Sequence, residues 1–327
     1  MTGTMRAMVY ERFGEPGDVL EIREVPIPAI GDEEVLVRVH TAGVNPLDWH
    51  YMIGKPYFAR AVLGWRRPKR SIPGNDIAGT VESVGDAVTF FAVGDEVFGE
   101  AFGGGLAEYV AVAEEGLVHK PPSLSFEEAA SVPVAAFTAL QGLRDWGRLQ
   151  PGADVLIIGA SGGVGTFAVQ IAKAMGATVT AVCSTRNVET ATALGADRVI
   201  DYQRESFLED GTGYDLIFDV PGTTPLRELR RLLGPDGVYV LVGGRKGDWV
   251  QPLPRLMAMT LSALLGLMET GNGTAVRTKT DLVLLRDWLE SGRISPVIDR
   301  NYKLDESVDA LTYQGTFHAR GKIVVTI

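Results

Sequence analysis

The segment DVLIIGASGGVG, residues 154–165, decides the fold of this chain. Its first part, Asp154–Gly159, is an apolar run typical of a fully buried strand. Gly159, Gly162 and Gly165 then follow at intervals of three residues. Beyond them, apolar side chains recur at the spacing of one helix face: Val164, Phe167, Ala168, Ile171, Ala172 and Met175. The segment predicts a strand, a tight turn and an amphipathic helix in succession.

The spacing of the three glycines has a chemical reason. A dinucleotide-binding turn needs glycine for the tight bend, for close approach of the backbone to a pyrophosphate, and for helix–strand packing. The helix N-terminus then offers free N–H groups and the positive end of its dipole to the phosphates. A glycine-rich turn without a ligand is the alternative. Strand, turn, helix and next strand all fall within about 30 residues, which favours dinucleotide binding.

Strands and helices alternate around this segment, from Gly152 to Gly244. Thr224 is predicted to cap a helix whose first residue is Pro225. Buried strands that alternate with helices indicate an α/β fold with a doubly wound parallel sheet. The further predicted strands are residues 177–183, 198–201, 215–219 and 238–242.

The chain before about residue 125 has a different pattern. Its segment Gly79–Gly99 is rich in Val and Phe and contains two Gly-Asp pairs, Gly85-Asp86 and Gly94-Asp95. Such pairs favour turns between short strands. This part of the chain is therefore predicted to form a compact antiparallel barrel.

Composition excludes several classes of function. The 327 residues suffice for two domains, and the net charge of −10 offers no basic surface for nucleic acid or anionic lipid. The one basic cluster, residues 66–70, is interrupted by Pro68 and is predicted to be a solvated loop. The single cysteine, Cys183, can form neither an intrachain disulfide nor a multi-cysteine zinc site.

The chain is also predicted to be soluble and cytoplasmic. Its first residues carry charges where a signal peptide would need an apolar core. The most hydrophobic stretch, Leu256–Met268, is shorter than the ~20 residues needed to span a bilayer. We expect it to form a buried or interface helix, and we expect no membrane partner.

The end of the second strand indicates the coenzyme. An NAD-binding protein usually carries an acid there, ~20 residues past the glycines, to hold the ribose 2′-hydroxyl. This chain has Ser184 and Arg186 and no acid in the stretch 182–187. Ser184 can donate to a 2′-phosphate and Arg186 can pair with it, although Arg186 capping a surface turn is the alternative. The substitution favours NADPH.

An ordered set of motifs resembles the medium-chain dehydrogenase/reductase superfamily, in its zinc-free quinone oxidoreductase (zeta-crystallin-like) branch. The resemblance extends over essentially the whole chain. It implies a GroES-like β-barrel catalytic domain, residues 1–125 and 295–327, around a Rossmann NADPH-binding domain, residues 126–294, with the active site in the cleft. The motifs are AGVNPLDW (42–49), IPGNDIAGTVESVGDAV (72–88), GDEVFG (94–99), GASGGVG (159–165), LGAD (194–197) and GKIVV (321–325).

The same resemblance bears on zinc. Zinc-dependent members place a cysteine where Asn45 stands and a His-Glu pair where Asn75 and Asp76 stand. Asparagine is a poor zinc ligand beside thiolate or imidazole. No metal site is therefore expected.

The resemblance also implies cofactor contacts. Asn45 would lie beside the nicotinamide ribose and the reacting carbon, and Thr138 on the nicotinamide side. For Thr138 and Tyr202 a structural role is an equal alternative. The remaining contacts would be Ser161, Gly162, Gly163 and Val164 at the pyrophosphate, Ser184, Arg186 and Tyr202 at the 2′-phosphate, Leu241, Val242 and Gly243 behind the nicotinamide, and Gly321 and Lys322 on its far side.

The predicted reaction is NADPH-dependent hydride transfer to a quinone or to the C=C bond of an enone. Asn45, Asp48, His50 and Tyr51 are the candidate catalytic residues. His50 can protonate an enolate near neutral pH, or else it packs against the ribose or faces solvent. Asp48 is expected to orient the loop. The alternatives are an NAD(P)-dependent alcohol dehydrogenase and an NADPH-binding partner protein with vestigial activity. A homodimer is expected, because zinc-free relatives commonly pair.

Overall fold

The structure is a computed structural model that describes residues 3–243 and 253–327. It contains two compact units. The first comprises Met1–Ala135, Arg277–Gly292 and Pro296–Ile327, and the second comprises Ala136–Val276 and Arg293–Ser295.

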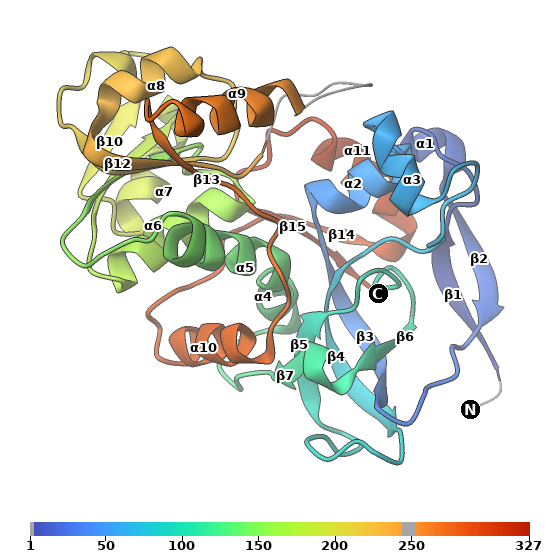
Figure 1. The fold of residues 1–327 in the computed structure, drawn as a ribbon. Helices are drawn as coiled ribbons and strands as arrows, with labels where there is room; N and C mark the ends of the chain where they lie inside the picture. The colour runs from blue at the N-terminus through green and yellow to red at the C-terminus, as the bar shows by residue number, and fades with distance from the viewer. Residues whose placement is uncertain (1–2, 244–252) are drawn as a thin grey trace. The chain divides into compact units, whose positions relative to one another are not determined.

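The second unit is built on a parallel sheet with the order β10-β9-β8-β11-β12-β13 (Figure 1). This is the strand order of a Rossmann fold. Successive strands are added on one side of β8 up to β10 and then on its other side from β11 onward, so the strand order reverses between β8 and β11. The strands are β8 (Asp154–Ile158), β9 (Thr178–Cys183), β10 (Arg198–Asp201), β11 (Tyr214–Asp219), β12 (Leu233–Leu241) and β13 (Glu269–Gly271). The predicted doubly wound parallel sheet is confirmed.

Helices cover this sheet because their apolar faces match its buried strands. In α6 (Gly163–Ala174), Phe167, Ala168 and Ile171 are fully buried, as their helical spacing predicted. The other helices are α5 (Pro133–Gln141), which crosses the boundary between the units, α7 (Val188–Ala193), α8 (Leu226–Leu232) and α9 (Leu253–Leu264). One local prediction was wrong: Pro225 is the N-cap of α8 with ψ of 135°, because an extended residue precedes the first helical turn.

The apolar segment 256–268 is less buried than predicted. In α9 only Met259 is fully buried, whereas Met257 and Leu264 are 72% and 80% exposed. Among the described residues, no helix has the length and apolar character required to cross a membrane. The interface alternative for this segment therefore stays a prediction.

The first unit is a mainly antiparallel sheet with the order β14-β15-β3-β4-β5-β7, to which β6 adds on β3. The last strand of the chain, β15, pairs antiparallel with β3, so the C-terminal segment lies in the same sheet as the N-terminal strands. The strands are β3 (Glu34–Val44), β4 (Asp76–Val84), β5 (Glu96–Glu100), β6 (Tyr109–Ala113), β7 (Leu117–His119), β14 (Ile298–Lys303) and β15 (Lys322–Thr326), beside the hairpin β1 (Thr4–Val9) and β2 (Glu21–Pro26).

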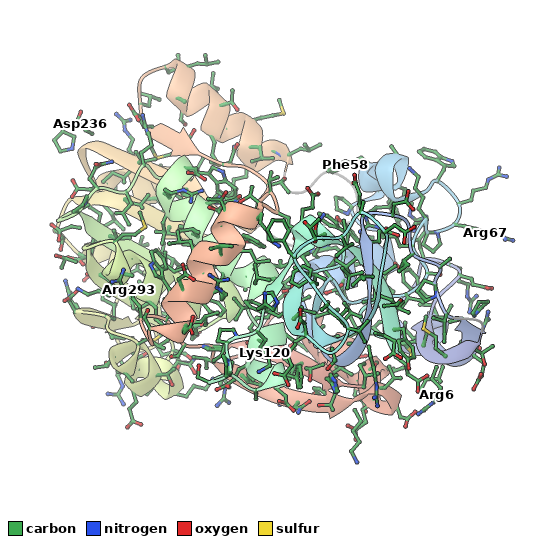
Figure 2. The ribbon with its side chains drawn as sticks, turned by 90° about the horizontal axis from the view of Figure 1, so that it is seen from below. Arg6, Phe58, Arg67, Lys120, Asp236 and Arg293 are labelled. Carbon is green, nitrogen blue, oxygen red and sulfur yellow. The ribbon has the colours of Figure 1, made fainter. Side chains whose placement is uncertain are left out.

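Short helices close this sheet around its core. These are α1 (Pro16–Val19), α2 (Pro46–Ile53), α3 (Arg60–Leu63), α4 (Phe126–Ala130), α10 (Lys279–Glu290) and α11 (Ser307–Gln314). The basic cluster 66–70 lies on an exposed loop after α3, where Arg67 points away from the ribbon (Figure 2).

The unit boundaries differ from the predicted domain limits at two helices. The prediction assigned residues 126–294 to the nucleotide-binding domain, but α4 packs on β3 and β4 and α10 packs on β7. The Lys279 ammonium at the start of α10 donates to the carbonyl oxygen of Glu114 at 3.3 Å and to that of Leu117. The sequence shows the apolar face of α10 but not the surface that it covers.

Candidate active site

Six buried polar residues gather in the first unit, and we call them the polar cluster. They are Asn45, Asp48, Asn75, Asp76, Glu100 and Lys322, and none is more than 8% exposed. They come from the start of α2, the start of β4, the end of β5 and the start of β15. Because burying charges costs free energy unless they are paired, such a cluster at the end of a sheet marks a candidate site.

Asp48 ties two segments together. One carboxylate oxygen accepts from the backbone N–H of Asn45 at 2.8 Å, and the other accepts from the backbone N–H of Gly74 at 3.0 Å and from Nδ2 of Asn75 at 2.6 Å. Burial raises the pKa of Asp48 to about 6, against the lowering effect of its hydrogen bonds to Asn45 and Gly74. These contacts fit the orienting role that the sequence favoured for Asp48.

Asp76, Asn45 and Lys322 form a second network. The Asn45 Nδ2 donates to Asp76 Oδ2 at 2.9 Å, and Lys322 Nζ lies 3.3 Å from the same oxygen. Lys322 also donates to Asn45 Oδ1. Burial raises the pKa of Asp76, and Lys322 and Asn45 oppose that rise. Lys322 is 3% exposed and is held inside the cluster.

Glu100 was missed by the sequence reasoning. It ends β5, where its Cα pairs with that of Asp76 in β4. Burial raises its pKa to about 7, and the negative charge of Asp76 adds to the rise. A glutamate at the end of a Val- and Phe-rich strand carries no local signal, because only the strand pairing sets it beside a second buried acid.

His50 and Tyr51 lie half-buried on the next turn of α2. His50 Nδ1 is 3.2 Å from the Lys55 carbonyl oxygen, and its ring packs edge-on against Trp49 and near Phe317. Burial raises the pKa of Tyr51.

Of the predicted catalytic residues, Asn45 and Asp48 lie together in the polar cluster with Lys322. His50 lies instead among aromatic side chains.

In the second unit, the glycine turn (residues 159–165) has the shape that its sequence predicted. Gly159 has φ of +81°, and a Cβ there would lie 2.9 Å from Pro221 Cδ. A Cβ on Gly165 would lie 2.1 Å from the Gly159 carbonyl oxygen, so the helix can approach the strand only with glycine here. At Gly162 the nearest such atom is 3.7 Å away.

The glycine turn therefore fits a dinucleotide. Its open position, Gly162, is the N-cap of α6 and has no side chain to satisfy the first N–H groups of that helix. Ser161, Gly163 and Val164 are half-buried around it. This is the arrangement that binds a pyrophosphate at a helix N-terminus.

The residues predicted for the 2′-phosphate lie near one another at the ends of β9 and β10. Ser184 is 7% exposed and accepts from Asn187 Nδ2 at 3.0 Å, while Tyr202 is 56% exposed and follows β10 directly. Arg186 is exposed and has no ion pair with the described part of the chain. An unpaired guanidinium is available for an anion.

An acid that was not predicted from the sequence lies beside Ser184 and Arg186, the residues that follow β9. Asp201, at the end of β10, accepts from Thr185 Oγ1 at 2.6 Å and from the backbone N–H of Gln203 at 3.0 Å. These hydrogen bonds lower the pKa of Asp201, and the bond from the Thr185 hydroxyl contributes most. The sequence pattern points to the end of β9, whereas Asp201 ends the neighbouring strand, and its side chain binds the loops that follow the two strands.

The remaining predicted cofactor residues fall in three places. Leu241 ends β12 and is buried, and Val242 and Gly243 continue from it half-buried; a Cβ on Gly243 would lie 2.3 Å from the Val220 carbonyl oxygen. Thr138 is half-buried in α5. Gly321 has φ of +117°, and a Cβ there would lie 2.3 Å from the Val297 carbonyl oxygen in the first unit. Backbone conformation and close packing therefore both require glycine at this position.

The residues at the zinc-ligand positions do not fit zinc. Asn45 Oδ1, the atom of Asn45 that could bind a metal, accepts from the Lys322 ammonium. Asn75 turns its Nδ2 to Asp48. A dication would be repelled by the ammonium already among these side chains, and amides are weak zinc ligands.

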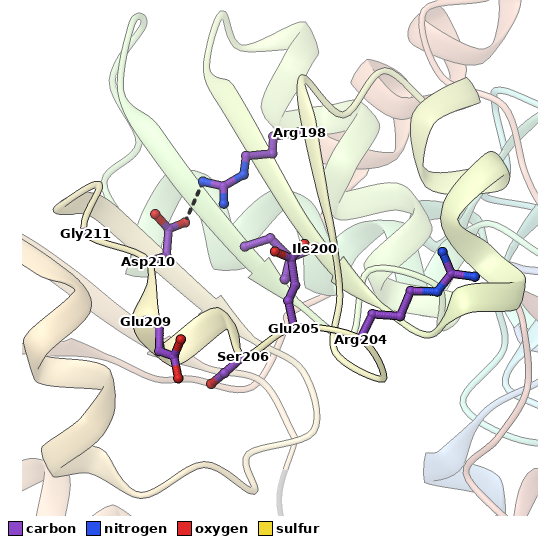
Figure 3. A pocket seen from close by; sticks show the side chains of 8 residues that line it. All are labelled: Arg198, Ile200, Arg204, Glu205, Ser206, Glu209, Asp210 and Gly211. Atoms are coloured by element: carbon purple, nitrogen blue, oxygen red, sulfur yellow. Dashed lines mark hydrogen bonds and ion pairs between the residues drawn. The ribbon is translucent and has the colours of Figure 1, made fainter.

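A separate pocket lies beside the edge strand β10 (Figure 3). Its volume is about 470 Å³, and it is lined by Arg198, Ile200, Arg204, Glu205, Ser206, Glu209, Asp210 and Gly211. Arg198 pairs with Asp210 at 3.0 Å and Arg204 lies 3.4 Å from Asp201. Because both arginines of this pocket are already paired with carboxylates, neither is available to bind an anion. The pocket also includes no residue of the polar cluster or of the glycine turn.

Comparison with known proteins gives the class. The family model described as "Alcohol dehydrogenase GroES-like domain" matches residues 31–122, and the one described as "Zinc-binding dehydrogenase" matches residues 194–325. A chloroplastic quinone-oxidoreductase homolog of Spinacia oleracea is 40% identical over 333 residues, which cover 98% of both chains.

Two further relatives extend this result. A chloroplastic NADPH-dependent alkenal/one oxidoreductase of Arabidopsis thaliana is 32% identical over 98% of this chain and 79% of its own length. The structure of the quinone oxidoreductase from Coxiella burnetii superposes with a TM-score of 0.84 at 28% identity, with 99% of each chain covered. The chain therefore belongs to the medium-chain dehydrogenase/reductase superfamily and is an oxidoreductase. Within it, the chain is of the zinc-free quinone oxidoreductase type, as its motifs predicted.

Proposed function

We propose that this protein is an NADPH-dependent reductase that acts on quinones or on the C=C bond of α,β-unsaturated carbonyl compounds without zinc. The observation that carries the proposal is the Lys322 ammonium, which lies among Asn45 and Asp76, two of the residues that stand at zinc-ligand positions. A buried cation there would repel a zinc ion, which supports a reaction that proceeds without zinc. The names of the spinach and Arabidopsis relatives support the acceptor class and the coenzyme.

The glycine turn, with Ser161, Gly162, Gly163 and Val164, would hold the pyrophosphate of NADPH. Ser184, Arg186 and Tyr202 would hold the 2′-phosphate; the exposed and unpaired guanidinium of Arg186 supports this assignment. Thr138, Leu241, Val242 and Gly243, together with Asn45, are proposed for the nicotinamide. When bound, NADPH supplies a hydride to an electrophilic carbon of the acceptor.

The chain's own residues would stabilise the charge that develops on the acceptor oxygen. Asn45 retains one N–H beyond its bond to Asp76, and an N–H donor aimed at developing charge lowers a barrier. His50 is proposed to deliver the proton or to order a donor water, with solvent as the alternative source. Asp48 holds Asn45 and Gly74 in place and is proposed to orient the site.

The product distinguishes this proposal from its rivals. NADPH oxidation would be measured over a panel of quinones, alkenals and alkenones, and the products identified. From an enone we expect the saturated ketone or aldehyde, because reduction of the carbonyl itself normally needs a Lewis acid such as zinc. An allylic alcohol as the main product would overturn the mechanism. If His50 supplies the proton, His50→Ala lowers turnover roughly ten- to a hundredfold.

Two rival functions have separate tests. The description of the matched family models favours an alcohol dehydrogenase. One zinc per chain by elemental analysis, with activity lost to chelators, would support that reading. An NADPH-binding partner protein would bind the coenzyme tightly and turn over no acceptor of the panel.

A cytoplasmic homodimer is the proposed state of the protein. The exposed side chains of Met257, Leu261, Leu264 and Leu265 on α9 favour a subunit interface, and β13 is an edge strand of the parallel sheet. Light scattering at micromolar concentration tests the dimer, and a monomer would contradict it. The free, buried thiol of Cys183 is compatible with a reducing compartment such as the cytoplasm.

A further inference from the structure

Lys322 has contacts that a cofactor-closing residue does not require. It begins β15, its side chain is 3% exposed, and its ammonium contacts Asn45 Oδ1 and Asp76 Oδ2. A lysine that is fully enclosed, rather than extended to solvent, is costly to bury. Its ammonium acts on two neighbours, Asn45 and Asp76.

The ammonium determines which way the Asn45 carboxamide faces. An ammonium is a donor only, so the atom of Asn45 that faces Lys322 must be the oxygen. The Asp76 carboxylate is an acceptor only when ionised, so the atom that faces it must be the nitrogen, at 2.9 Å. Both charges select the same orientation, and a flipped amide would face two mismatched partners. Asn45 is left with one N–H to donate elsewhere.

The Asn75 carboxamide is fixed through its nitrogen and leaves its oxygen unbonded within the described part of the chain, whereas Asn45 is left with a donor. Its Nδ2 donates to Asp48 Oδ1 at 2.6 Å, and its Oδ1 has no hydrogen-bond partner among the described residues although Asn75 is only 2% exposed. The two asparagines thus have fixed and opposite polarity. Asn45 keeps a donor and Asn75 keeps an acceptor, and in each case a charged neighbour enforces the choice.

We propose that Lys322 is a positioning residue that holds the Asn45 carboxamide as a hydrogen-bond donor toward the oxygen of the bound acceptor. The inference rests on the proposed function, in which Asn45 serves that oxygen. It assigns Lys322 to the orientation of a catalytic amide rather than to the binding of NADPH. No proton leaves Lys322 in this role.

The test uses the full-length protein. Lys322→Met alone leaves the Asp76 carboxylate buried and unpaired, whereas Asp76→Asn keeps the lysine donor that faces Asn45 Oδ1 and leaves Asp48 as a nearby opposite charge. The comparison is therefore made between Asp76→Asn and Asp76→Asn/Lys322→Met. We expect the double variant to turn over ten- to a hundredfold more slowly than Asp76→Asn, with the Kd for NADPH within threefold. If Lys322 acts through Asn45, adding Lys322→Met to Asp76→Asn/Asn45→Ala lowers turnover by less than threefold.

A matched control is Lys120, a second buried lysine of the same unit (Figure 2). Lys120→Met should leave turnover within threefold of the wild type. Equal turnover of Asp76→Asn and Asp76→Asn/Lys322→Met would overturn the inference. So would a Lys322→Met loss that persists undiminished without the Asn45 side chain, or one that appears in the Kd for NADPH.

A second readout needs no turnover. The side-chain amide protons of Asn45, identified by NMR through their loss in Asn45→Ala, should exchange with solvent at least tenfold faster in Asp76→Asn/Lys322→Met than in Asp76→Asn. Unchanged exchange contradicts the positioning role. If the wild type reduces no acceptor but this difference is found, the proposed function fails while the positioning of Asn45 by Lys322 stands.

Discussion

The glycine turn and the polar cluster, the two places proposed to hold a charged or polar ligand, are built by opposite means. In the turn the proposed binding groups are backbone N–H donors, and the side chains are absent because Gly159 and Gly165 have no room for a Cβ. In the cluster the proposed binding groups are side chains that are themselves held by buried charges, as Lys322 and Asp76 hold Asn45.

This difference has consequences for stability. A backbone site costs the fold little, because helix N-terminal N–H groups are unsatisfied in any case. The cluster encloses three carboxyl groups and one ammonium, so each removal leaves an uncompensated group in a dry place. Substitutions in the cluster should therefore change the free energy of unfolding, and those at the open position of the turn should change binding.

The largest effect is expected from Lys322→Met. Removing one partner of a buried ion pair typically costs about 3–5 kcal/mol, since the Asp76 carboxylate then stays buried and unpaired. Urea unfolding measures the loss, and Asp76→Asn/Lys322→Met should recover at least half of it. Lys120→Met should cost about 1–2 kcal/mol, because its partner Glu96 is 50% exposed and can be hydrated. Equal losses for the two lysines would remove the distinction between the cluster and an ordinary buried lysine.

The next effect concerns pH. Burial raises the pKa of Glu100 from 4.5 to about 7, with Asp76 and Asp48 adding to the rise and Arg277 and Arg70 opposing it. Because the folded-state pKa lies above the unfolded value, this carboxyl stabilises the fold fully below pH 4.5, and the contribution is lost as the pH rises through about 7. Glu100→Gln should therefore gain about 3 kcal/mol relative to wild type between pH 4.5 and pH 8. A pH-independent difference in unfolding free energy would show that Glu100 titrates normally.

The turn itself separates stability from binding. Gly165→Ala places a Cβ 2.1 Å from the Gly159 carbonyl oxygen and should lower the free energy of unfolding by about 1–3 kcal/mol. Gly162→Ala meets nothing closer than 3.7 Å and should change it by less than about 1 kcal/mol. The Kd for NADPH should nevertheless rise tenfold or more in Gly162→Ala. Tight binding in that variant would mean that the pyrophosphate lies elsewhere.

The smallest effect concerns the choice of coenzyme. With Ser184 and the unpaired Arg186 beside the 2′-position, NADPH should bind at least tenfold more tightly than NADH, a difference of about 1.4 kcal/mol. Arg186→Ala should remove most of this preference, as measured by coenzyme titration. Arg204→Ala is a matched control, since that guanidinium is already beside Asp201. Equal affinity of the wild type for both coenzymes would contradict the assignment.

Local sequence determined the centre of the Rossmann unit, its strands β8 to β12 and the helix α6. The strand Asp154–Ile158, the glycines and the amphipathic α6 are contiguous, so periodicity and glycine spacing suffice to predict them. The same holds for the antiparallel strands around Gly79–Gly99. The positions of Ser184 and Arg186 just after β9 could also be predicted from the sequence, whereas their contact with a 2′-phosphate stays a prediction.

Only the tertiary structure decided the polar cluster. Lys322 and Asn45 are 277 residues apart in the sequence and meet because β15 pairs with β3. Glu100 stands beside Asp76 through the pairing of β5 with β4, and α10 covers β7 although the chain places it after the Rossmann strands. Periodicity reports which face of an element is buried, but not which distant element covers it. The polarity of an asparagine depends on the charges that face it, and those charges come from elsewhere in the chain.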